Sequence, residues 1–138
     1  MIKDFDVSCF KPVSYELRLE SVSELDGKGE VPSSRNVKLP YVLKPGKYVL
    51  GTTFESLKMP ASLMAVLVPT SFAIRIGVGI NCGKIDPTYL GKVYFGIYNL
   101  SDREISLKSR MRLVHLLVSE FKGETIPLET KYFGVELK

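Results

Sequence analysis

The chain has 138 residues, 45% of them hydrophobic, which suffices for one domain with a buried core and is too little for two. Its apolar stretches are broken by charged residues, glycine or proline before they reach the length of a membrane span, and residues 1–6 carry charges where a signal peptide needs an apolar run. We therefore expect a cytoplasmic, soluble protein with one domain over 1–138, a lead-in at 1–11 and a C-terminal tail at 122–138.

The charge pattern indicates which classes of binding partner to expect. The formal net charge of +4 favours an anionic partner, yet acidic and basic residues are interspersed along the chain. The sequence has no basic block, zinc-finger spacing or aromatic RNA-binding signature, so we expect a phosphorylated small molecule and no nucleic acid or membrane. Cys9 and Cys82 lack metal-ligand spacing and are interpreted as free thiols.

Short strands dominate the pattern along the chain. Apolar or alternating runs at 48–50, 65–68 and 93–98 are bounded by glycine, proline, aspartate or asparagine, as strands are. Turn signals recur at short intervals, and no window predicts an amphipathic helix of three turns. The pattern predicts an all-β sandwich or barrel. The polar segment 23–36 is expected to be a mobile loop or a hairpin excursion.

The run 113–118 is apolar at every position except His115. A strand of this kind is expected to be covered on both faces. The second face of the strand would be buried either by other strands within a barrel or by another subunit. The pattern does not distinguish these two possibilities.

Five segments in a fixed order contain motifs that resemble those of one superfamily. Residues 11–19 resemble the opening Pro-x-Ser-x-Asp-Leu-Arg-Leu strand of dCTP deaminases. Residues 43–55 and 59–63 resemble the family's Leu-x-Pro-Gly, Thr-x-Glu and Leu-Pro-x-x-Leu elements. Residues 83–91 are similar to the Gly-x-Ile-Asp-x-x-Tyr-x-Gly hairpin with which dUTPases bind nucleoside, and 98–116 resemble the Asn-containing turn and the Arg-Ile-x-Gln-Leu strand. The chain is thus identified as a member of the trimeric dUTPase and dCTP deaminase superfamily, similar to its archaeal and viral members.

The resemblance implies a distorted jelly-roll β-barrel of the dUTPase-like type. It also implies a homotrimer with three active sites at the subunit contacts and a nucleoside triphosphate, dUTP above all, as ligand. Mg²⁺ would be held mainly by the triphosphate of that substrate, with no direct ligand from the chain.

The hairpin motif implies three roles in the site. Asp86 would be the base that activates water, although an aspartate before Pro87 is also a common turn residue. Tyr89 would pack beneath the deoxyribose, or it is an ordinary strand aromatic. Asn81 and Gly83 lie where the family reads the pyrimidine edge, and Asn81 is also explained as a turn residue.

Residues 70–75 resemble the motif that contacts phosphate. The leading arginine of that motif is replaced by Pro69, while Thr70 and Ser71 keep hydroxyl groups and Arg75 can supply charge nearby. Loss of the arginine fork is expected to weaken triphosphate binding.

The late strand and the tail hold the remaining phosphate candidates. Arg112 matches the family's arginine, and Arg110 stands where the family usually has glycine. His115 replaces a phosphate-ordering glutamine, although a lone histidine in an apolar strand is more often structural. In the tail, Lys131 resembles a phosphate ligand, with Val135 where the deaminases have glutamine.

Gly96 decides the predicted function. It stands where deaminases carry their acid/base glutamate, so deamination of cytosine is disfavoured and is expected to be absent. The preferred prediction is a dUTP diphosphatase that uses Mg²⁺, supported by Asp86, Tyr89, Glu16, Arg112 and Lys131. The open alternative is a catalytically impaired trimer with a nucleotide-binding, regulatory or structural role, supported by Pro69, Arg110 and Val135.

Overall fold

The computed structural model describes residues 1–25 and 34–124. A short lead-in precedes the first long strand: β1 (Ile2–Lys3), the 3-10 turn η1 (Val7–Cys9), β2 (Phe10–Lys11) and then β3 (Ser14–Leu25). The following elements are β4 (Ser34–Val37), β5 (Tyr41–Leu43), β6 (Tyr48–Lys58), β7 (Leu63–Pro69), α1 (Ser71–Ile76), β8 (Val78–Asn81), β9 (Lys84–Ile85), β10 (Leu90–Asn99), β11 (Ile105–Leu107) and β12 (Arg112–Glu120). The all-β prediction is therefore confirmed, with one helix of six residues in the described part of the chain.

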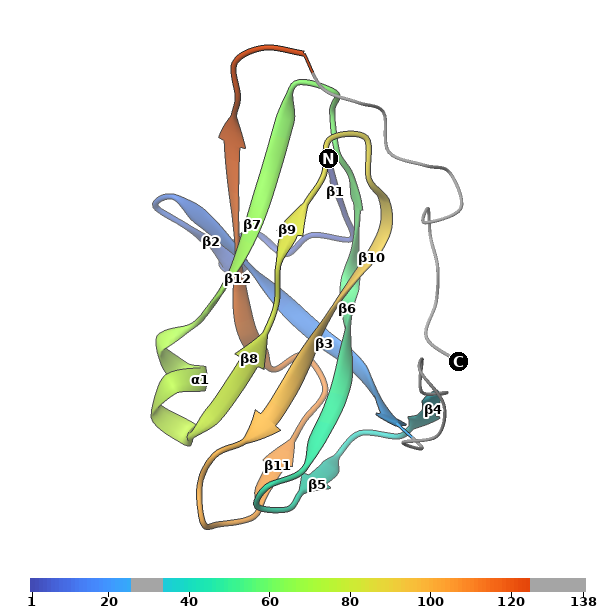
Figure 1. Ribbon diagram of the computed structural model, residues 1–138, viewed down its shortest axis with the longest axis vertical. Coiled ribbons are helices and arrows are strands. Elements are labelled where there is room, and N and C mark those ends of the chain that lie inside the picture. The colour runs from blue at the N-terminus through green and yellow to red at the C-terminus, as the bar shows by residue number, and fades with distance from the viewer. Residues whose placement is uncertain (26–33, 125–138) are drawn as a thin grey trace.

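The strands form a curled antiparallel sheet in the order β8-β10-β6-β3-β12-β7-β9 (Figure 1). β11 and β5 pair separately as a two-stranded sheet. Along β6 the burial alternates strictly, because successive side chains of a strand point to opposite faces. Val49 and Leu57 point inward from β6, where they meet Leu17 and Leu19 of β3 in the core. The other face of β6 carries half-buried side chains, including Tyr48.

β12 lies between β3 and β7, and its burial differs from the prediction for 113–118. Leu113, Val114 and Leu116 are buried, whereas Val118 is 37% exposed. The reason is that the pairing with β3 ends at Leu116, after which β12 continues beside β7 alone. The prediction that both faces of this strand are buried is thus correct for the first half of 113–118 and wrong for its end.

The ends of segment 23–36 are paired as a hairpin. Ser23 lies opposite Asn36, and Glu24 lies opposite Arg35. The centre of this segment lies outside the described residues.

α1 forms because both of its ends are capped. The Thr70 hydroxyl accepts a hydrogen bond from the amide of Ala73 at 3.1 Å, and Gly77 ends the helix with φ of 88°. Within the described residues, no helix is long and apolar enough to cross a membrane.

Candidate functional site

Gly96 lies beneath the side chain of Tyr48. Gly96 of β10 pairs with Leu50 of β6, so Tyr48 is its diagonal neighbour on the same face of the sheet. A Cβ atom built on Gly96 would overlap the Tyr48 hydroxyl and ring. The phenol therefore fills the space that any larger residue at position 96 would need.

Asn81 completes this cluster from the other side. It lies opposite Gly96 in the pairing of β8 with β10, and its amide Nδ2 donates a hydrogen bond to the Tyr48 hydroxyl at 3.1 Å. Asn81 is exposed and Tyr48 is half-buried, so both polar groups can be reached from solvent. Tyr48 was not among the site residues predicted from the sequence. The available signal was Gly96 itself, because a glycine inside a strand often marks a close approach of another group.

Asp86 and Tyr89 lie in the turn that joins β9 to β10. The Asp86 carbonyl accepts a hydrogen bond from the Tyr89 amide at 3.2 Å, and the Asp86 carboxylate forms an ion pair with Lys84. The Tyr89 hydroxyl donates to the Lys92 carbonyl, and burial raises the pKa of Tyr89 to about 12. Asp86 is thus a turn residue in this chain, and its side chain, 39% exposed, is open to solvent as well.

Thr70 has a structural role, whereas its neighbours among the predicted phosphate contacts are exposed. The Thr70 hydroxyl caps α1 and also donates to the Arg112 carbonyl at 3.0 Å, while its residue is 2% exposed. Both hydrogen-bonding functions of this hydroxyl are therefore used within the fold. Ser71 and Arg75 are exposed on α1.

His115 and Arg112 both contact the start of the chain. His115 Nδ1 lies 3.0 Å from the Ser14 hydroxyl, which agrees with a structural histidine. The Arg112 guanidinium donates to the carbonyl of Ser8 at 3.2 Å and to its hydroxyl at 3.1 Å. It also lies 3.8 Å from the carboxylate of Glu16.

A basic hollow of about 420 Å³ opens beside these residues, lined by Glu16, Phe72 and 108–112. Lys108, Arg110 and Arg112 give it three cationic side chains against one carboxylate. Arg110 has φ of 68°, a left-handed conformation that glycine adopts most easily. Its guanidinium lies 3.4 Å from the centroid of the Phe54 ring, a cation–π contact that glycine could not make.

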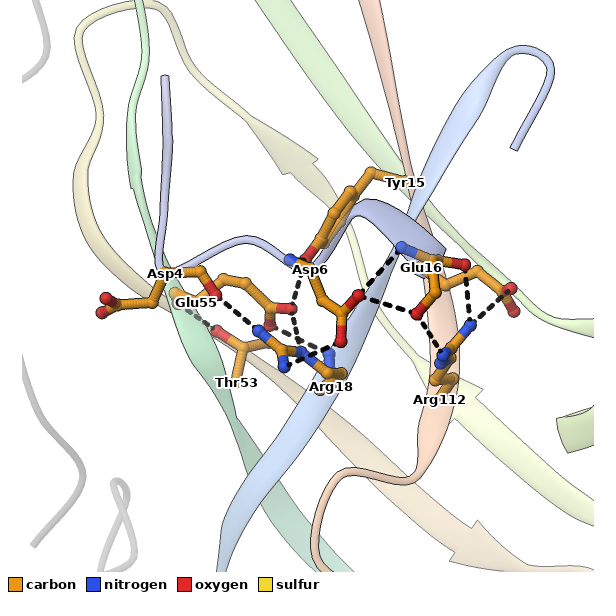
Figure 2. A network of polar contacts seen from close by, with 9 residues as sticks. Asp4, Asp6, Tyr15, Glu16, Arg18, Thr53, Glu55 and Arg112 are labelled. Atoms are coloured by element: carbon orange, nitrogen blue, oxygen red, sulfur yellow. Dashed lines mark hydrogen bonds and ion pairs between the residues drawn. The ribbon is translucent and has the colours of Figure 1, made fainter. Parts of the chain in front are cut away.

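A buried charge network fixes the lead-in against the sheet (Figure 2). The Glu55 carboxylate is fully buried and accepts hydrogen bonds from the Tyr15 hydroxyl at 2.7 Å, the Arg18 amide at 2.9 Å and Arg18 Nε at 2.8 Å. The Tyr15 hydroxyl in turn accepts from the Asp6 amide at 3.0 Å. Hydrogen bonds from Ser8 lower the pKa of Asp6, whose carboxylate lies 3.8 Å from Arg18. The sequence motifs that contain Arg18 and Glu55 thus meet in one ionic contact.

One chain does not bring the predicted site together. The turn that holds Asp86 lies at one end of the molecule, and α1 lies towards the other end (Figure 1). Gly83 lies between β8 and β9, with open space where a side chain would be. Lys131 and Val135 lie outside the described residues. In residues 1–25 and 34–124, no group of three or more histidine, cysteine, aspartate or glutamate side chains could hold a metal ion.

Comparison with known proteins identifies the family. A family model described as dCTP deaminase-like matches residues 1–121. The chain belongs to the dCTP deaminase-like family. A relative from Dictyoglomus turgidum, described as a dUMP-forming dCTP deaminase, is 32% identical over 96 residues, which are 68% of this chain and 48% of the relative. The chain therefore spans about half the length of this curated relative.

Solved structures of the dCTP deaminase and dUTPase branches share the fold. The dCTP deaminase of Agrobacterium tumefaciens superimposes with a TM-score of 0.71 at 22% identity, over 85% of this chain and 43% of that one. The dUTPase of EIAV gives a TM-score of 0.61 at 15% identity, over 93% and 90% of the two chains. These likenesses confirm the predicted dUTPase-like β fold. The family match and the deaminase relative confirm the predicted superfamily.

The preferred function from the sequence was wrong. The dCTP deaminase-like family match and the deaminase relative favour the branch that Gly96 was thought to disfavour, and they do not support a dUTP diphosphatase. The motifs used for the prediction resemble an opening strand of dCTP deaminases and a nucleoside-binding hairpin of dUTPases, so together they could not rank the two branches. The ranking depended on a single position, which is weak evidence for function.

Proposed function

We propose that this protein is a dCTP deaminase-like enzyme that binds dCTP and removes the amino group of its cytosine ring. The observation that carries the proposal is the family match over residues 1–121. In support, the Tyr48 hydroxyl and the Asn81 amide form an accessible polar pair on the sheet face that contains Gly96. Such a pair can form hydrogen bonds with a pyrimidine ring.

The proposed reaction requires groups near this sheet face that can transfer protons. Hydrolytic deamination adds water at C4 of cytosine and releases ammonia, so protons must move between water, ring and leaving group. Gly96 cannot move a proton. In the proposal, other polar groups carry out these proton transfers. The hydroxyl of Tyr48 occupies the space over Gly96.

The basic hollow supports binding of the triphosphate. Arginine and lysine side chains bind phosphate through charge-assisted hydrogen bonds. Lys108, Arg110 and Arg112 provide such groups, and the carboxylate of Glu16 lies beside Arg112. In the proposal, Mg²⁺ arrives with the triphosphate and neutralises part of its charge.

We also propose that the active protein is a homotrimer. The Asp86 turn and α1 are far apart in one chain (Figure 1), so a site that uses both needs two subunits. A closed ring of three provides three equivalent contacts of this kind. Light scattering is expected to give three times the chain mass of 15.4 kDa, and a mass near that of one chain would contradict the trimer.

The enzymatic proposal is tested by incubating the protein with dCTP and Mg²⁺ and separating the products. Ammonia and a deoxyuridine nucleotide are expected. If dCTP is recovered intact, deamination is excluded.

A further inference from the structure

The Tyr48 hydroxyl is held in one orientation on the sheet face. Asn81 Nδ2 donates to it at 3.1 Å, so the hydroxyl acts as acceptor in that contact and its own hydrogen stays free to donate. Gly96 leaves the space in which the phenol lies. The position of the hydroxyl therefore depends on residues from three strands: Tyr48 on β6, Gly96 on β10 and Asn81 on β8.

The pair presents a donor beside an acceptor. Tyr48 offers its O–H group, and Asn81 offers its side-chain carbonyl, which shares a carbon atom with the amide nitrogen that holds Tyr48. The edge of cytosine carries the opposite order, an acceptor at N3 beside an amino donor at C4. Uracil reverses both groups, with N–H at position 3 and a carbonyl at C4.

A hollow lies beside Tyr48. Its volume is about 460 Å³, and Glu24, Leu25, Tyr41, Val42, Lys44 and Lys47 line it together with Tyr48, whereas Asn81 and Gly96 are not among its lining residues. This volume falls in the range of small-molecule sites, roughly 300–1,000 Å³. Lys44 and Lys47 are exposed and outnumber the one carboxylate of this lining, Glu24, so the hollow carries a net positive charge that favours an anionic ligand.

We propose that Tyr48, oriented by Asn81, determines the preference of this protein for cytosine over uracil. The proposal rests on dCTP binding at this face, as proposed above. The Tyr48 hydroxyl donates to N3 of cytosine, and the Asn81 carbonyl accepts from the C4 amino group. With uracil in the same pose, donor would face donor and acceptor would face acceptor, and polar groups left unpaired against a bound ligand are a strong source of discrimination.

The test compares dCTP and dUTP binding by titration calorimetry in the presence of Mg²⁺. The parent protein is expected to bind dCTP more tightly than dUTP. Tyr48→Phe removes the donor and keeps the ring over Gly96, so its dCTP affinity is expected to fall about tenfold, the upper size of one neutral hydrogen bond, with little change for dUTP. Asn81→Ala, at an exposed position, is expected to reduce the same preference.

Tyr98→Phe is the matched control, because Tyr98 lies opposite Tyr48 in the pairing of β10 with β6 and is 38% exposed. This change is expected to leave both affinities as they are. An unchanged ratio of dCTP to dUTP affinity in Tyr48→Phe would overturn the role of Tyr48 while leaving dCTP binding intact. A parent protein that binds no dCTP would overturn this inference together with the proposed function.

Discussion

Replacing Glu55 with glutamine is expected to lower the free energy of unfolding by about 3–5 kcal/mol, the usual effect of breaking a buried ion pair. The Glu55 side chain is 0% exposed and that of Arg18 is 12% exposed, so the carboxylate has no water, and the guanidinium little, to replace its partner. Glutamine would keep the volume but remove the negative charge. It would also turn one of the two acceptors of the carboxylate into a donor, which would then face Tyr15 or Arg18.

Glu24→Gln is the matched control for this change. Glu24 pairs with Arg35 at 2.7 Å, but the Arg35 side chain is 75% exposed, and pairs of that kind contribute only about 0–1 kcal/mol. Urea unfolding followed by circular dichroism gives both values. Equal losses of unfolding free energy in the two variants would show that the Glu55–Arg18 contact stabilises the fold no more than the exposed pair does.

Gly96→Ala is expected to destabilise the protein by about 1–3 kcal/mol, as overpacking in a well-packed region does. In an ordinary strand the same change would favour folding, because glycine has the largest conformational freedom to lose. Here the new methyl group would overlap the Tyr48 phenol. The ring would have to swing aside and give up its hydrogen bond with Asn81.

A double-mutant cycle isolates this contact. In a Tyr48→Ala background the cost of Gly96→Ala is expected to disappear, because the overlapping ring is gone. Gly83→Ala serves as the control, since no atom lies within 4 Å of a Cβ at that position. If Gly96→Ala costs the same with and without Tyr48, the two residues do not compete for space.

The strands could be predicted from the sequence because each has its own local pattern. Alternation along β6 and the turn residues around it required no knowledge of distant residues. The burial of Val118 could not be predicted, because it depends on where the pairing of β12 with β3 ends. Register is a property of two strands, and one strand's pattern does not contain it.

The site was predicted less well than the fold for the same reason. Gly96 and Tyr48 are far apart in the sequence and meet only through the register of β10 with β6. The sequence therefore indicated a missing carboxylate at position 96, and the structure reveals a tyrosine in its space. Asp86 was correctly placed in a turn, whereas its distance from α1 depends on the whole fold (Figure 1).

The most direct measurement of the proposed activity is product analysis after the full chain has been incubated with dCTP and Mg²⁺ at high protein concentration. Ammonia and a deoxyuridine nucleotide are expected to appear in equal amounts, while dATP in a parallel reaction is expected to be recovered unchanged. Recovery of all the dCTP, with no ammonia above the reaction without protein, would contradict the proposed deaminase activity of this chain.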